Sequence, residues 1–162
     1  APVPFPLMMR ASEIFVGVTD EALRIGALVR FRAEGDSMYP TIRNGETITI
    51  AAVSPDEVVR GDVLLCRRDM RLLAHRLVGV TAHGADRLFH LRGDAKAGCD
   101  APVGTDALVG KVVYVCRNGR MTPLCGPVAR LRHGVRAAAS RAKALLRSKT
   151  AVAFRGVAVE WQ

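Results

Sequence analysis

The stretch from Arg30 to Ile50 reads RFRAEGDSMYPTIRNGETITI, and we expect it to decide the fold. Two apolar, strand-like runs flank a tight centre that holds Gly35, Ser37 and Pro40. Glycine adopts backbone angles that side chains forbid, and proline fixes its own φ and restricts the residue before it. We therefore expect Ser37 on a stiff turn at the end of a strand. Its hydroxyl could face a substrate there, or it could hydrogen-bond its own backbone as many turn serines do.

The charge of the chain is unevenly distributed. Residues 127–162 hold eight of the 24 lysines and arginines but one of the 15 acidic residues, Glu160. The remaining residues 1–126 therefore carry 16 basic and 14 acidic side chains and are nearly neutral. A basic tail of this kind indicates an acidic partner surface, which could be anionic lipid, nucleic acid or an acidic protein.

Several classes of protein are excluded by composition. Hydrophobic residues make up 49% of the 162 residues, which argues against global disorder. No run without Asp, Glu, Lys or Arg exceeds nine residues, so no segment of this sequence is expected to span a bilayer. The four cysteines form no C-x-x-C pair, which argues against zinc and favours reduced thiols, although one disulfide stays open. Residues 1–9 lack the charged start of a secretory signal.

The pattern of apolar residues predicts a mainly β fold. A loose apolar stripe predicts a helix from Arg10 to Gly26, and Thr19 to Glu21 could cap a second short helix. Alternation then predicts strands over 28–33, 46–53, 62–67, 71–81, 87–92 and 108–117. Asn118-Gly119 predicts a hairpin that pairs 112–117 with 120–124. We expect a compact antiparallel β-domain over 28–126, preceded by a helical segment over 1–27.

The segment 127–162 is expected to be a basic amphipathic tail. Apolar residues from Val128 to Leu146 recur at helical spacing, and seven cations cover the remaining faces. Such a helix could pack on the β-domain or lie on an anionic membrane surface, and both alternatives stay open.

A serine nucleophile needs a base within hydrogen-bond reach, and His75 is the best candidate. The run Leu73-Ala74-His75-Arg76-Leu77 places His75 between leucines on one strand face, where it could equally be a structural histidine. Imidazole titrates near neutrality, as proton transfer requires. His90 is the main rival.

A carboxylate that orients the histidine is also expected, and two are available. Asp94 and Asp100 bracket a loop after a predicted strand, and either could reach back to His75. Both could also be ordinary loop residues.

Five short motifs in order resemble the superfamily of type I signal peptidases and LexA-type serine peptidases. They are Gly35-Asp36-Ser37-Met38-x-Pro40, Asn44-Gly45-Glu46, Arg60-Gly61-Asp62-Val63, His75-Arg76-Leu77-Val78 and Arg92-Gly93-Asp94 followed by Asp100, within about residues 28–117. The histidine is similar to that of the endoplasmic-reticulum and archaeal branch of signal peptidases. Two features differ from other members: Gly35 stands where some carry a helping serine, and Asp36 is more like the repressor branch, which uses lysine as its base.

The resemblance implies a serine endopeptidase of a signal peptidase-like kind. Ser37 would be the nucleophile, His75 the base, and Asp100 the orienting residue with Asp94 in reserve. Asp36, Met38 and Pro40 would border the substrate and the oxyanion, and no metal or cofactor is implied. The partner would be an extended peptide, with an anionic membrane surface as a further candidate for 127–162 and nucleic acid disfavoured. We expect a cytoplasmic or peripheral membrane location. The alternative is a LexA-like β-module for dimerisation and regulation, either non-catalytic or self-cleaving.

Overall fold

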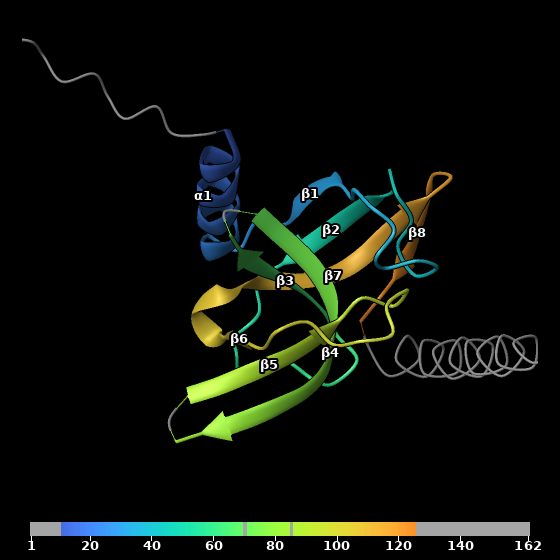
Figure 1. The fold of residues 1–162 in the computed structure, drawn as a ribbon. Helices are drawn as coiled ribbons and strands as arrows, with labels where there is room; N and C mark the ends of the chain where they lie inside the picture. Colours follow the sequence, from blue (N-terminus) through green and yellow to red (C-terminus); the bar gives the residue numbers. More distant parts are fainter. Residues whose placement is uncertain (1–10, 70, 85, 126–162) are drawn as a thin grey trace, which may run out of the picture.

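One antiparallel sheet of eight strands dominates the protein and curls around its own core (Figure 1). The structure is a computed structural model that describes residues 11–69, 71–84 and 86–125. Its elements are α1 (Ala11–Arg24), β1 (Val29–Arg32), β2 (Thr47–Ala51), β3 (Val63–Arg68), β4 (Arg71–His83), β5 (Asp86–Arg92), β6 (Val103–Gly104), the short 3₁₀ helix η1 (Thr105–Ala107), β7 (Leu108–Arg117) and β8 (Arg120–Pro123).

The strand order explains why the sheet curls. The strands follow the order β1-β2-β7-β3-β4-β5-β6, and β8 pairs with β7. The long strand β4 changes partner along its length: residues 71–76 pair with β3, whereas residues 76–83 pair with β5. Bulges in the pairing of β7 with β2 and β3 add to the bend. His75 and Arg76, where β4 changes partner, are buried.

Two hydrophobic cores share β3. Val63 and Leu65 belong to the larger core with strands β1, β2 and β7, while Leu64 and Cys66 face a smaller core under β5. A strand that is buried on both faces should read as a continuous apolar run, and β3 reads VLLC. Burial raises the pKa of the Cys66 thiol to about 12, so this cysteine stays protonated.

Helix α1 packs one face against the sheet. Val16, Thr19 and Leu23 are buried, and Leu23 joins the larger core. The Phe15 ring meets Phe31 of β1 edge to face, with 5.5 Å between ring centroids. These contacts place the helix beside the end of β1, just before the loop of residues 33–46 that holds Ser37 and is called the serine loop below.

The fold confirms the expected mainly antiparallel β-domain with an N-terminal helix. Each strand expected between residues 28 and 124 appears, with ends shifted by a few residues, and Asn118 and Gly119 form the hairpin turn with positive φ. The very short β6 and η1 were not expected, because two or three residues carry no periodicity.

The expectation that Thr19 to Glu21 cap a second short helix was wrong. Helix α1 continues through these residues to Arg24, and the Thr19 hydroxyl donates to the Phe15 carbonyl oxygen (2.8 Å) one turn earlier in the same helix. The amphipathic helix expected within 127–162 lies outside the described residues.

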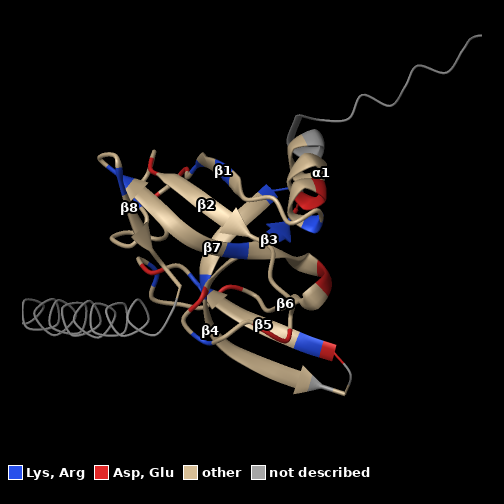
Figure 2. Ribbon diagram, turned by 180° about the vertical axis from the view of Figure 1, so that it is seen from behind, with Lys and Arg blue, Asp and Glu red and all other residues tan. Residues whose placement is uncertain are grey.

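Charges of both signs are interspersed over the described elements (Figure 2), in keeping with the nearly balanced composition of residues 1–126. Within the described ranges, no helix combines the length and apolar character that crossing a bilayer demands. All four cysteines are free thiols.

Candidate active site

Ser37 lies in the loop that joins β1 to β2. Gly35, at φ 84°, begins the turn, and its N–H donates to the Asn44 side-chain oxygen (3.0 Å) across the loop. After Ser37 the loop is anchored, because the side chains of Met38 and Ile42 are buried in the larger core. The backbone around Ser37 is therefore held from below while its side chain stays partly exposed.

His75 lies within hydrogen-bond reach of Ser37. It belongs to the first half of β4, has no exposed surface, and its Nε2 is 2.9 Å from the Ser37 Oγ. Its Nδ1 is hydrogen-bonded to Oδ2 of Asp100. When Nδ1 carries the ring proton and donates a hydrogen bond to the carboxylate, Nε2 has a free lone pair that faces the serine hydroxyl. The described residues thus form a chain of serine, histidine and aspartate.

Asp100 is positioned by the loop that follows β5. Its backbone N–H donates to the Leu91 carbonyl oxygen (2.8 Å), which returns the loop to the end of β5. Burial alone would raise the pKa of the Asp100 carboxyl, but hydrogen bonds and charge from His75 and Lys96 outweigh it and hold that pKa below its usual value. The carboxylate is therefore ionised at neutral pH, as an orienting group requires.

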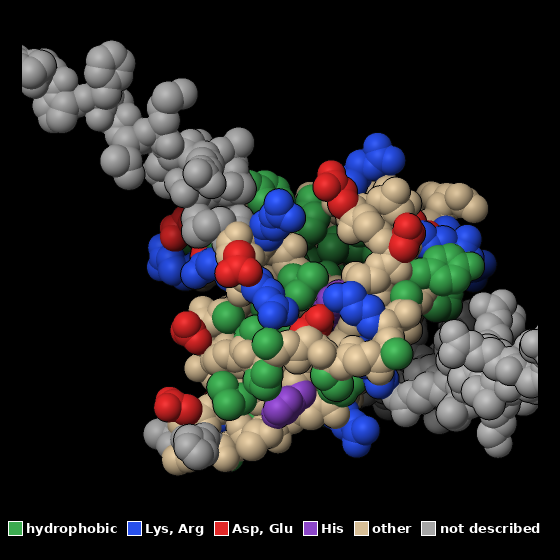
Figure 3. Space-filling view, in the orientation of Figure 1, with side chains coloured by type: hydrophobic (Ala, Val, Ile, Leu, Met, Phe, Trp, Pro, Cys, Tyr) green, Lys and Arg blue, Asp and Glu red, His purple; other side chains and the backbone are tan. Residues whose placement is uncertain are grey.

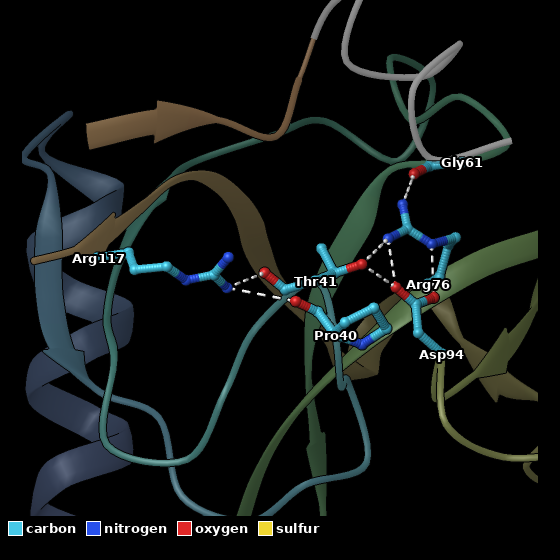
Figure 4. A network of polar contacts seen from close by, with 6 residues as sticks. All are labelled: Pro40, Thr41, Gly61, Arg76, Asp94 and Arg117. Carbon is cyan, nitrogen blue, oxygen red and sulfur yellow. Dashed lines mark hydrogen bonds and ion pairs between the residues drawn. The ribbon is translucent and has the colours of Figure 1, made fainter. Parts of the chain in front are cut away.

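Asp94 has a different set of partners from Asp100. Its two carboxylate oxygens accept from Arg76 Nε (2.7 Å) and the terminal Nη2 (2.6 Å), and one of them also accepts from the Thr41 hydroxyl (Figure 4). Arg76 also donates to the Gly61 carbonyl oxygen (2.7 Å). Of the two aspartates that the sequence left open, Asp100 is thus the one that meets His75, while Asp94 ties the serine loop to β4.

Arg117 secures the serine loop from its other side. Its guanidinium donates to the carbonyl oxygens of Pro40 (3.2 Å) and Thr41 (3.4 Å), as Figure 4 shows, and pairs with the Glu46 carboxylate. The hydrogen bond from Arg117 lowers the pKa of Glu46. Sequence reasoning missed this contact, because Arg117 and Glu46 are 71 positions apart.

Gly93 allows the closest approach in the site. A Cβ built on Gly93 would lie 2.5 Å from the Ser37 carbonyl oxygen and 3.2 Å from His75 Nε2. Two residues further along the chain, the Ala95 N–H donates to the same Ser37 carbonyl oxygen (2.9 Å). Gly93 was quoted in a motif but not recognised as a site residue, since its role depends on this contact.

A hollow of about 700 Å³ opens beside Ser37. Its walls come from residues 31–35 at the end of β1 and residues 71–74 at the start of β4, and its floor includes Met38 and Ile42. Figure 3 shows hydrophobic side chains inside a depression that is bordered by charged ones. Met38 lines the hollow, and the backbone carbonyl oxygen of Pro40 accepts from Arg117. Asp36 is exposed and its carbonyl oxygen accepts from the Tyr39 N–H (3.0 Å).

His90 is separate from this constellation. Its Nε2 pairs with the Thr81 hydroxyl (2.6 Å) on the outer part of the hairpin formed by β4 and β5. Within the described ranges, no three His, Cys, Asp or Glu side chains are grouped closely enough to hold a metal ion.

No protein-family model matches this chain, and comparison with curated proteins finds no significant relative. What the chain does must therefore be inferred from its own residues.

Proposed function

We propose that this chain is a serine endopeptidase in which Ser37 is the nucleophile, His75 the general base and Asp100 the orienting carboxylate. The observation that carries the proposal is the position of the His75 ring, with Nε2 2.9 Å from Ser37 Oγ and Nδ1 bonded to Asp100. A structural histidine would be satisfied by the backbone, whereas this buried ring pairs with a hydroxyl at a hollow. The resemblance of the five motifs to signal peptidases and LexA-type peptidases supports the same chemistry.

The reaction proceeds in two steps. Ser37 Oγ attacks the carbonyl carbon of the scissile peptide while its proton passes to His75 Nε2. The tetrahedral intermediate collapses, the amine leaves with that proton, and the acyl group stays on Ser37 as an ester. His75 then takes a proton from water, the hydroxide attacks the ester, and the new carboxylic acid leaves as Ser37 recovers its proton.

Backbone N–H groups serve as the oxyanion donors. In the described part of the chain, the N–H of Ser37 makes no hydrogen bond, which leaves it available to the developing oxyanion. Gly35, which stands where some signal peptidases carry a helping serine, offers no side-chain donor. Rigid donors of this kind stabilise the intermediate without reorganising. Arg76, which donates to the Thr41 hydroxyl, and Arg117, which donates to the Pro40 and Thr41 carbonyl oxygens, supply that rigidity to the loop (Figure 4).

The substrate is an extended peptide that lies in the hollow. Strand β1 is at the end of the strand order, and residues 71–74 of β4 precede the point where pairing with β5 begins at Arg76. Among the described residues, both strands thus present an unpaired edge toward the hollow. A peptide strand can hydrogen-bond to such edges and place alternate side chains against the apolar floor.

Replacing Ser37 with alanine tests the proposal. Wild-type protein is incubated with an unbiased peptide library, cleavage is read by mass spectrometry, and a fluorophosphonate probe reports covalent labelling of the serine. Ser37→Ala should lose labelling and reduce cleavage by roughly 10⁴-fold or more. Ser54→Ala is the matched control, because Ser54 is an exposed turn serine. Equal labelling and cleavage by wild type and Ser37→Ala would end the proposal.

A further inference from the structure

The ammonium group of Lys96 lies against the side of the Asp100 carboxylate that His75 does not use. Lys96 Nζ is 3.2 Å from Asp100 Oδ1, while Oδ2 bonds to His75. Asp100 retains 11% exposure and Lys96 48%, so this cation is the carboxylate's partner on the solvent side. The two residues are four positions apart in one loop, and the Lys96 N–H donates to the Gly93 carbonyl oxygen (3.0 Å).

The stem of Lys96 is also part of the site. A Cβ built on Gly93 would lie 3.3 Å from Lys96 Cδ and 3.2 Å from His75 Nε2. The aliphatic stem and the imidazole therefore flank the same glycine. From this position beside Gly93, the Lys96 head group reaches the Asp100 carboxylate.

The geometry points to Lys96 as a positioning residue that holds the outer oxygen of Asp100 and keeps that carboxylate aimed at His75. This inference rests on the proposed function for its role in the reaction. The contact itself does not rest on that function, because it concerns how Lys96, Asp100 and His75 are coupled in the protein without substrate. Lys96 was not recognised from the sequence, where it stood among four lysines that all looked remote from Ser37.

The charges around His75 give the sign of the effect. The ring is faced by Asp100 and by the Ser37 hydroxyl, and its neighbour on β3 is the uncharged Leu64. Arg76, the next residue in the chain, is paired with Asp94, and these two charges offset each other. A cation on Asp100 disfavours protonation of the imidazole, so its removal should let His75 gain a proton at higher pH.

The test compares Lys96→Met, which keeps the stem and removes the charge, with Lys96→Arg, which keeps the charge. Arg87→Met is the matched control, because Arg87 stands at the start of β5 and forms an exposed ion pair with Asp56 (3.0 Å). The first readout is the titration of the His75 ring by NMR in the absence of substrate. The second is the pH dependence of kcat/KM for a peptide that wild type cleaves.

We expect Lys96→Met to move the His75 titration and the acid limb of kcat/KM to higher pH, because the cation that disfavours the imidazolium is gone. Lys96→Arg should restore both, and Arg87→Met should leave both unchanged. The shift should shrink in about 1 M salt, where the Debye length is about 3 Å. The inference is overturned if Lys96→Met leaves the His75 titration unmoved, or if Lys96→Arg shifts it as far. Because the NMR titration needs no catalysis, an inactive wild-type protein would reject the peptidase proposal and still leave the coupling decided.

Discussion

Replacing Gly93 with alanine should misplace the serine while leaving the functional side chains chemically intact. Gly93 is buried where the loop after β5 crosses the serine loop. Its new methyl group would meet the carbonyl oxygen of Ser37, which belongs to backbone and cannot rotate away. The serine loop, the loop after β5, or both must therefore move.

The size of the movement follows from the geometry. The Cβ would lie 2.5 Å from the Ser37 oxygen, about 0.9 Å inside the 3.4 Å at which ordinary contact begins. A misplacement of about 1 Å at a reacting group can cost about 100-fold in rate. Overpacking of a tight site typically costs about 1–3 kcal/mol of stability. We expect a loss of about 100-fold in kcat/KM with a protein that is destabilised but still folded.

Gly98→Ala is the matched control for this experiment. Gly98 lies in the same loop, and a Cβ built on it meets nothing within 4 Å. Peptide cleavage, fluorophosphonate labelling and thermal unfolding are measured for both variants at a temperature where both are folded. The control should resemble wild type in all three measurements.

Two outcomes would refute the reasoning. Wild-type cleavage by Gly93→Ala would mean that the close approach to Ser37 does not define the reactive geometry. Equal losses in Gly93→Ala and Gly98→Ala would mean that the loop tolerates no added side chain, whatever its distance from the serine.

Two further predictions concern the residues around the serine. His75→Asn should abolish cleavage because it removes the base, whereas His90→Asn should not, because the His90 ring pairs with Thr81. Peptide-cleavage rates of both variants test this, and a loss of activity in His90→Asn alone would assign the base to His90. Asp94→Asn should lower the free energy of unfolding by about 3 kcal/mol in urea titration, because it breaks an ion pair with an Arg76 side chain that is only 10% exposed. Asp100→Asn should instead reduce cleavage more than stability, and the reverse ranking of the two aspartates would contradict their assignment.

Most of the fold could be predicted from local patterns. The alternation of apolar residues located the strands, and Asn118-Gly119 located a hairpin, because these signals lie within a few neighbouring residues. The order of the strands could not be read in this way. Strand β7 pairs with β2, β3 and β8, and this arrangement depends on which faces bury together over the whole chain.

The candidate site likewise combines residues that local sequence could predict with contacts that it could not. Ser37 and His75 were proposed from residue type, the turn and the strand face. The residues themselves left Asp94 and Asp100 open, and only the resemblance favoured Asp100. In the tertiary structure, six positions of loop bring Asp100 to His75 and leave Asp94 against Arg76. A loop's path is determined by long-range contacts that no short window of sequence contains.

The sequence by itself therefore determined the β-rich class, the serine on a stiff turn and the histidine on a buried strand face, because each depends on local backbone preference and periodicity. The tertiary structure decided the close approach at Gly93, the support of the loop by Arg117 and the contact of Lys96 with Asp100. These are distances between backbone and side-chain atoms of different segments. They exist only after the sheet has curled and brought the serine loop and the loop after β5 together.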